Sequence, residues 1–284
     1  MTDSNSNHLF DIIQNFDRED ILELLGNVEK KLELEQNLIY IPQGKTMVIG
    51  DLHGDIVSLK KILQIFFRDA FQTILFLGDY VDRGPKQLEV INTLFHYKRI
   101  MPERVVLLRG NHEDRFINRN YGFYDELRLK FTSYKELFRR YNQVFSILPI
   151  AAITWNKIFC VHGGVPEGLE DIEEINFLPK NHEDKDCAIS TQLIWNDPRE
   201  KGKDFRQSTR GPGIKTFGKK AFNDFMTYNN LTLMIRGHER FKNGFKTYFN
   251  EQLISIFSSQ SYSKRATATV AYINYEGDVE LMPL

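Results

Sequence analysis

The chain has 284 residues, of which 42% are hydrophobic, 26% charged and 13% aromatic, and these values exclude a disordered chain, a coiled coil and a collagen-like repeat. The 37 basic and 38 acidic residues give a net charge of -1, so no overall field favours nucleic acid or an anionic membrane. The two cysteines, Cys160 and Cys187, are too few for a disulfide framework, and we expect reduced thiols.

No segment of the sequence predicts export or membrane insertion. The first ten residues are polar and include Asp3, which argues against a signal peptide. The most apolar stretch, 144–155, contains Pro149 and is shorter than the roughly 18–20 apolar residues that span a bilayer. We therefore expect a cytoplasmic protein, or a nuclear one in a eukaryotic cell, with neither a membrane nor a nucleic acid as partner.

The N-terminal part of the chain has a helical pattern. Apolar residues recur at helical spacing through residues 9–38, and Asp17 is placed to cap a second helix within this range. Nothing here suggests chemistry. We expect residues 1–45 to form a helical segment packed on a catalytic domain that comprises residues 46–284.

Short apolar runs of β-type residues begin at residue 46, and most of them end in glycine followed by polar residues. Helical patterns lie between them, at 55–67 and, as the longest, at 123–147. This alternation predicts a layered α/β body within one domain. The predicted buried strands occupy residues 46–50, 73–78, 104–110, 157–161 and 231–237.

The polar residues that follow these runs are of the types that bind metal ions. Four histidines in matching places, with aspartate and asparagine beside them, are hard to explain as structural residues, because burying so many unpaired polar groups costs several kcal/mol. A shared metal centre would give them partners. Imidazole, carboxylate and amide ligands without thiolate favour Mn²⁺, Fe or Zn²⁺, and their number suits two ions. The residues are His53, His112, His162, His238, Asp51, Asp79, Asp82 and Asn111.

Two arginines are placed to bind an anionic substrate at this centre. Arg83 directly follows Asp82, and Arg210 lies in a glycine-rich loop. Two divalent ions with two aspartate ligands and a hydroxide leave a charge of about +1, which favours a phosphate ester dianion. Guanidinium groups bind phosphate oxygens in a forked geometry.

Three motifs resemble those of the PPP family of serine/threonine protein phosphatases: GDLHG at 50–54, GDYVDRG at 78–84 and GNHE at 110–113. The resemblance extends in the right order from about residue 46 to residue 262, and it implies a metallophosphoesterase-type β-sandwich flanked by helices. The further matching segments are 121–126, 148–151, 162–164, 195–198, 210–218 and 236–239.

The resemblance also implies a metal ligand set. Asp51, His53 and Asp79 match the ligands of the first ion, and Asp79 also matches the bridge between two divalent ions. The ligands of the second ion are matched by Asn111, His162 and His238. Mn²⁺ is the ion expected in vitro, with Fe and Zn²⁺ as alternatives.

The remaining roles concern the substrate. His112 matches the residue that protonates the leaving oxygen, and Asp82 matches its carboxylate partner, which is expected to fix the tautomer and favour the charged imidazole. A metal-bound water or hydroxide would attack phosphorus directly, without a phosphoenzyme. The phosphate-binding residues implied are Arg83, Arg210, Asn111 and Tyr262.

One segment departs from the family pattern. The family usually has Phe-Ser-Ala-Pro-Asn-Tyr-Cys near its C-terminus, whereas residues 257–263 read Phe-Ser-Ser-Gln-Ser-Tyr-Ser. Tyr262 is kept, but the proline and cysteine are lost. We expect a less rigid loop with an altered preference for substrates and inhibitors.

Three functions remain open at this point. The first is a metal-dependent phosphatase of phosphoserine and phosphothreonine in proteins, which would work with a phosphoprotein substrate and with regulatory subunits. The alternative is a small-molecule phosphoesterase such as a symmetrical dinucleoside tetraphosphate hydrolase. The third is an inactive scaffold that keeps the fold for binding. The segments at 121–126, 195–198 and 210–218 favour the first.

Overall fold

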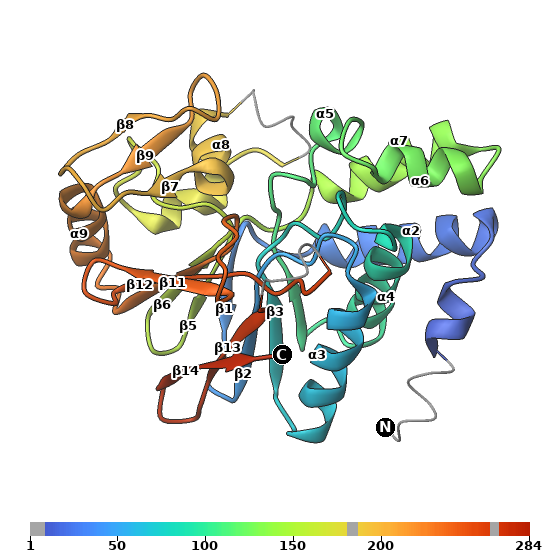
Figure 1. The fold of residues 1–284 in the computed structure, drawn as a ribbon, viewed down its shortest axis with the longest axis horizontal. Helices are drawn as coiled ribbons and strands as arrows, with labels where there is room; N and C mark the ends of the chain where they lie inside the picture. Colours follow the sequence, from blue (N-terminus) through green and yellow to red (C-terminus); the bar gives the residue numbers. More distant parts are fainter. Residues whose placement is uncertain (1–8, 181–186, 262–266) are drawn as a thin grey trace.

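Two β-sheets pack face to face at the centre of the molecule, with helices on their outer sides (Figure 1). The computed structural model describes residues 9–180, 187–261 and 267–284. In order across the first sheet, the strands are β1 (Leu38–Ile41), β5 (Ala151–Thr154), β6 (Ile158–Val161), β10 (Leu233–Arg236), β12 (Leu253–Ile256) and β11 (Phe245–Tyr248). Across the second they are β14 (Val279–Pro283), β13 (Thr269–Ile273), β2 (Thr46–Ile49), β3 (Thr73–Phe76) and β4 (Val105–Leu107).

Helices of two groups cover the sandwich. One group packs on the second sheet: α2 (Arg18–Leu32), α3 (Ile56–Arg68), α4 (Gln87–Ile100), α6 (Phe123–Lys130) and α7 (Tyr134–Phe145), with the short α5 (Arg115–Asn118) preceding α6. The other group packs on the first sheet: η1 (Ile172–Phe177), α8 (Ala188–Trp195) and α9 (Lys219–Tyr228). A small third sheet orders β7 (Asp197–Pro198), β9 (Lys215–Phe217) and β8 (Arg206–Gln207).

The central strands are buried on both faces, and therefore their sequences are continuously apolar. In β2, Val48 faces the opposite sheet, whereas Met47 and Ile49 face the helices. In β10, Ile235 joins the same inter-sheet core and Met234 packs toward the other helices. The predicted layered β-sandwich with flanking helices is confirmed, and all five predicted strands are present.

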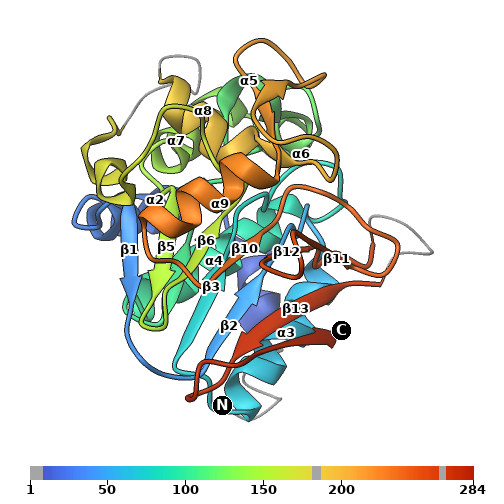
Figure 2. The ribbon, with the colours of Figure 1, turned by 90° about the vertical axis from the view of Figure 1, so that its left-hand side faces the viewer.

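Parallel pairing brings the carboxyl ends of the key strands to one edge. β2, β3 and β4 are mutually parallel in one sheet, and β6, β10 and β12 are parallel in the other. Figure 2 shows β1 beside β5, on the side of the molecule opposite β13 and β14. The polar residues that follow the parallel strands therefore meet where the two sheets adjoin.

The N-terminal segment is helical over a shorter range than predicted. Residues 9–13 are helical and α2 follows, with the side chain of Asp17 accepting a hydrogen bond from the Asp20 amide as an N-cap. The prediction of helix through Leu38 is wrong at its end, because Leu38 begins β1, which pairs with β5. Four apolar residues carry too short a pattern to separate strand from helix.

The single long helix predicted at 123–147 is also wrong, because the chain forms α6 and α7 there. Phe131 ends α6 in an extended conformation, and α7 begins after Ser133. The reversal places the Phe123 ring 5.1 Å from that of Tyr141. In a straight helix these residues would lie about 27 Å apart along the axis.

Gly26 offers a simple test of helix propensity in α2. No heavy atom lies within 4 Å of the position where a Cβ would be added, so alanine fits without a clash. We expect Gly26→Ala to raise the free energy of unfolding by about 0.5–1 kcal/mol, measured by urea denaturation, because alanine loses less backbone entropy in a helix. The matched change Gly110→Ala should be strongly destabilising, since its Cβ would meet Asp79 Oδ1 at 2.3 Å. A less stable Gly26→Ala protein would contradict this reasoning.

Within the part of the chain that the structure describes, no helix is both long and apolar enough to cross a bilayer.

Candidate metal centre

A cavity of about 550 Å³ opens at the carboxyl ends of the parallel strands. Of the predicted site residues, His162 lies fully buried beneath it and Asp82 lies buried behind His112, while Tyr262 falls outside the described residues. The predicted residues that line the cavity are Asp51, His53, Asp79, Arg83, Asn111, His112, Arg210 and His238.

The backbone bends sharply where these residues follow their strands. Five of them adopt positive φ angles between 46° and 71°, a region that is uncommon for residues other than glycine. Such strain is maintained only where the surrounding structure fixes it, and here it turns side chains from several loops toward one centre. The five are His53, Asp79, Asp82, Arg83 and His238.

Asp79, which follows β3, lies at the middle of the cluster. Its Oδ2 is 3.5 Å from His53 Nε2, and its Oδ1 is 3.3 Å from His162 Nε2. His53 follows a strand of one sheet and His162 a strand of the other. The carboxylate belongs to both groups of side chains that could hold a metal ion, one with His53 and His112 and the other with His162 and His238.

Two histidines are oriented by backbone carbonyl groups. His53 Nδ1 lies 2.9 Å from the oxygen of Val81, and His162 Nδ1 lies 3.1 Å from the oxygen of Leu77. Because a carbonyl can only accept, we assign the proton of each ring to Nδ1. The lone pair on each Nε2 then faces the centre, as in metal sites whose histidines donate to an outer partner.

A second set of ligand atoms surrounds His162 Nε2. It lies 3.0 Å from Asn111 Oδ1 and 3.1 Å from His238 Nδ1. Nε2 of His238 is buried and has no hydrogen-bond partner in the described ranges. Asp51 Oδ1 accepts a hydrogen bond of 2.8 Å from the His238 amide, which leaves Oδ2 on the His53 side, 3.8 Å from its Nε2.

The electrostatics of this cluster favour a cation. Burial raises the pKa of Asp51 to about 7. Burial, followed by the charges of Asp51 and Glu113, raises the pKa of Asp79 well above its ordinary value. Burial also lowers the pKa of His53 and His162, so the imidazoles stay neutral. Repelling carboxylates beside neutral imidazoles, without thiolate, form a donor set that fits divalent Mn, Fe or Zn.

His112 and Asp82 form a hydrogen-bonded pair at the side of the cavity. His112 Nδ1 is 2.6 Å from Asp82 Oδ2, and Asp82 Oδ1 accepts from the Phe123 amide at 3.0 Å. Burial and, to a smaller extent, the charges of Arg83 and Arg210 together lower the pKa of His112 to about 3. The free site therefore disfavours the charged imidazole, and the expectation that Asp82 favours it stays a prediction.

The two arginines are held in place by neighbours from distant segments. The Arg83 guanidinium lies 4.3 Å from the centre of the Tyr121 ring. Arg210 Nε lies 2.5 Å from Asp197 Oδ2, and the other oxygen of Asp197 contacts the buried Arg236 at 3.0 Å. Both guanidinium groups line the cavity that contains the ligand cluster.

Sequence reasoning assigned no role to Glu113, which organises the second sheet's side of the site. Its carboxylate accepts from the amides of Asp79 at 2.7 Å, Tyr80 at 2.9 Å and Gly110 at 3.0 Å. It therefore joins the chain after β3 to the chain after β4 and fixes the backbone of Asp79. Its place in the GNHE motif was the only feature of the sequence that could have pointed to this role.

We expect Glu113→Gln to lower both stability and metal affinity. In the wild-type protein each of these backbone N–H groups donates to a carboxylate oxygen, whereas in the variant the side-chain NH₂ group would face one of them. The lost hydrogen bond should lower the free energy of unfolding by an amount on the order of 1–3 kcal/mol. Displacement of Asp79 should weaken metal binding by about 10–100-fold, as is usual for outer-shell changes. Thermal unfolding and metal titration check both, with the exposed Glu103→Gln as control. Metal affinity equal to that of the control would contradict the assignment.

Comparison with known proteins agrees with this geometry. The model of the calcineurin-like phosphoesterase family matches residues 44–239. The chain belongs to this family. The metallophosphoesterase prediction is thus confirmed, together with phosphoester hydrolysis as the class of chemistry and a divalent metal as the class of cofactor.

Solved structures share the phosphoesterase fold over most of their length. One is a protein serine/threonine phosphatase from Saccharomyces cerevisiae with similarity to human phosphatase PP5; the TM-score is 0.84 at 24% identity, covering 95% of this chain and 90% of that chain. Another is a cold-active protein-tyrosine phosphatase from a psychrophilic Shewanella species, with a TM-score of 0.58 at 17% identity, covering 89% of this chain and 84% of that one. The resemblance to PPP phosphatases therefore extends from motifs to the whole fold.

Proposed function

We propose that this phosphoesterase is a metal-dependent phosphoprotein phosphatase that hydrolyses phosphoserine and phosphothreonine. The observation that carries the proposal is the position of Asp79, which has histidines of both sheets on either side. Arg83, Arg210 and His112 also line the cavity that this cluster faces, and Asp82 pairs with His112 from behind. Phosphoryl transfer to water needs these three elements together.

The ligand cluster divides into two halves around Asp79. We assign Asp51 and His53 to one ion, and Asn111, His162 and His238 to the other. Mn²⁺ is our choice in vitro, with Fe or Zn²⁺ as alternatives. When bound, divalent ions polarise the phosphate ester and lower the pKa of the water that attacks phosphorus.

Arg83 and Arg210 would bind and orient the phosphate, with Asn111 and Tyr262 as further contacts. Guanidinium groups match phosphate oxygens in pairs, and the Tyr121 ring and Asp197 carboxylate restrict how far these two can move. A phosphate held from two sides presents one face of phosphorus to the incoming water. Such positioning supplies much of the rate enhancement in phosphoryl transfer.

His112 would donate a proton to the serine or threonine oxygen as it leaves. The free site disfavours a charged imidazole, but a bound phosphate dianion neutralises Arg83 and Arg210, two of the groups that lower its pKa. Asp82 then stabilises the imidazolium through the 2.6 Å contact. Substrate binding and protonation of the acid are therefore linked in this proposal.

The contacts made by two segments that resemble protein phosphatases support the preference for phosphoproteins. Segment 121–126 provides the Tyr121 ring beneath Arg83, and its Phe123 amide holds Asp82. Segment 195–198 provides Asp197, which holds Arg210. The segments that resemble protein phosphatases are thus the ones that orient the phosphate and the proposed acid.

A comparison of specificity constants tests the proposal. Purified protein with Mn²⁺ would be given a phosphoserine/phosphothreonine peptide, the matching phosphotyrosine peptide and a symmetrical dinucleoside tetraphosphate, each also with chelator. We expect the highest kcat/KM on the phosphoserine/phosphothreonine peptide. We expect no activity on any of the three substrates when chelator is present. A higher kcat/KM on the dinucleotide would favour the small-molecule phosphoesterase, and absence of all activity would favour the scaffold.

The remaining aspects of the proposal follow from the same function. We propose a division of the chain at residue 45, regulatory subunits as partners and a cytoplasmic location, with the nucleus as an alternative in eukaryotes. Limited proteolysis, affinity purification and imaging of the tagged protein test these in turn.

A further inference from the structure

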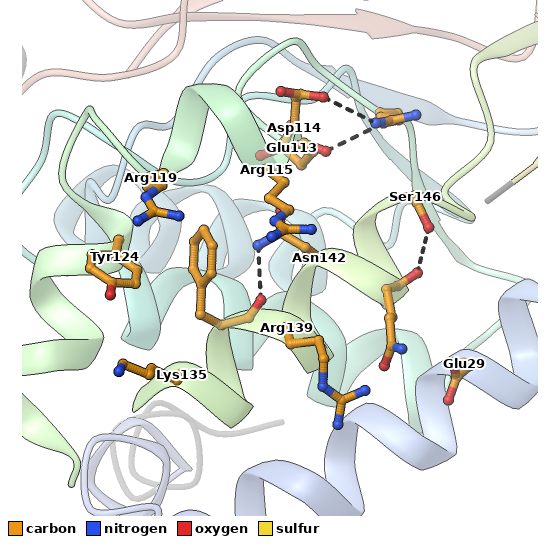
Figure 3. A pocket seen from close by; sticks show the side chains of 13 residues that line it. Glu29, Glu113, Asp114, Arg115, Arg119, Tyr124, Lys135, Arg139, Asn142 and Ser146 are labelled. Atoms are coloured by element: carbon orange, nitrogen blue, oxygen red, sulfur yellow. Dashed lines mark hydrogen bonds and ion pairs between the residues drawn. The ribbon is translucent and has the colours of Figure 1, made fainter. Parts of the chain in front are cut away.

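A second and larger cavity, of about 770 Å³, lies between α5, α6 and α7 (Figure 3). The loop after β4 and helix α5 contribute residues to both this cavity and the metal-site cavity. His112 lines the metal-site cavity, whereas the next two residues, Glu113 and Asp114, line this one. We call this second cavity the basic groove.

Two pairs of cations line the basic groove, and each pair is spaced four residues apart. Arg115 and Arg119 come from α5 and its C-terminal end, and Lys135 and Arg139 come from α7. Residues four apart in a helix share one face, so each segment presents its two charges together. Figure 3 shows these side chains distributed along the cavity rather than gathered at one point.

These four cations are not neutralised by the protein. All four are exposed, and none forms an ion pair with a residue in the described ranges. The Arg119 guanidinium lies over the face of the Tyr124 ring, 5.5 Å from its centre. The basic groove therefore has an uncompensated positive charge in a chain whose net charge is -1.

The acidic residues of the basic groove are already committed to other partners. Glu29 pairs with Arg140 at 2.8 Å. Glu113 accepts three backbone amides, and Asp114 caps α5 through the amides of residues 116 and 117. The carboxylates thus cannot turn to the exposed cations without breaking these bonds.

The floor between the cations is apolar and aromatic. The rings of Tyr124 and Phe138 lie edge to face, with centroids 4.9 Å apart. Asn142 and Gln143 add amide groups on the same side. A cavity of about 770 Å³ with separated charges and an aromatic floor fits an acidic peptide better than it fits one small anion.

We propose that the basic groove docks an acidic peptide segment of a protein partner or substrate, outside the metal-site cavity. Carboxylate side chains would pair with the two rows of cations, and an apolar residue between them would pack on Tyr124 and Phe138. The proposal rests on the proposed function in that a phosphoprotein would present such a segment. Binding is measured without turnover, so the two proposals can fail separately.

Fluorescence anisotropy of a labelled peptide, with glutamates flanking one phenylalanine, tests the groove on the full chain with Mn²⁺. We expect saturable binding that weakens with salt and is lost when glutamine replaces glutamate in the peptide. Arg115→Gln with Arg139→Gln should weaken binding by about 5–30-fold, whereas Lys61→Gln with Lys219→Gln, elsewhere on the surface, should not.

Further measurements distinguish an acidic peptide from other possible occupants of the basic groove. Both double variants should keep the wild-type melting temperature and the wild-type turnover of a small aryl phosphate, because none of the substituted residues belongs to the metal site. Equal peptide affinity in the two variants would overturn the proposal. Displacement of the peptide by inorganic phosphate would also overturn it, because it would indicate that the peptide binds at Arg83 and Arg210. A dimer that forms without peptide and is broken only by Arg115→Gln with Arg139→Gln would overturn it as well, because a second copy of the chain would then occupy the basic groove.

Discussion

The His112→Asn protein is expected to bind metal normally and to hydrolyse a phosphoserine peptide roughly 10²–10⁴-fold more slowly, which is the usual loss for a missing general acid. Asparagine keeps the backbone amide that donates to Asp79 Oδ1 at 2.9 Å, so the central carboxylate should stay in place. It removes the imidazole that contacts Asp82 and that would protonate the leaving oxygen. The change is measured as kcat at saturating substrate, with metal content determined on the same sample.

A second substrate makes this test specific for proton donation. p-Nitrophenolate is a stable anion and leaves without a proton, whereas a serine alkoxide does not. The loss caused by His112→Asn should therefore be much smaller on p-nitrophenyl phosphate than on the phosphoserine peptide. Equal losses on both substrates would show that His112 acts by positioning the phosphate or the metal instead.

Asp79→Asn should have opposite effects on activity and on the stability of the metal-free protein. Asparagine tolerates the positive φ of 55° and its oxygen can still accept from the His112 amide. It removes a buried carboxyl whose charged form is disfavoured by burial and by the charges of Asp51 and Glu113. We expect an increase in unfolding free energy on the order of 1–3 kcal/mol in chelator, and a fall of at least about a hundredfold in kcat/KM with metal.

Thermal unfolding in chelator and with added Mn²⁺ distinguishes the two effects. The wild-type protein should gain stability from the metal, whereas Asp79→Asn should gain little, because weaker binding contributes less to the folded state. The exposed Asp11→Asn should behave like wild type in both conditions. A less stable Asp79→Asn protein in chelator would mean that the carboxylate is satisfied without a cation.

The sequence predicts that these polar residues lie close together because they follow strands. Asp51, Asp79 and His162 each come directly after or near the end of an apolar run, and parallel pairing carries them to one edge. What the sequence does not reveal depends on contacts between distant segments. The three amides bound by Glu113 come from two different loops. No sequence pattern near these residues predicts the direction of the amides or the positive φ of Asp79.

Two other discrepancies have a related cause. The run Leu38–Ile41 becomes a strand only because β5 lies beside it, and the break after Phe131 is stabilised by the packing of Phe123 on Tyr141. The low pKa of His112 arises from burial by the whole fold and from the charges of Arg83 and Arg210, whereas the sequence points only to the neighbouring Asp82. Tertiary surroundings decide each of these features.

The hydrogen bond from the His238 amide to Asp51 connects residues 187 positions apart. Asp51 follows β2 and His238 follows β10, so the ligand cluster needs residues from both sheets. Contacts between such distant positions form slowly, because the intervening chain must first be ordered. During refolding, tight metal uptake should therefore appear only after the two sheets have docked, and its rate should report the last step of folding rather than the first.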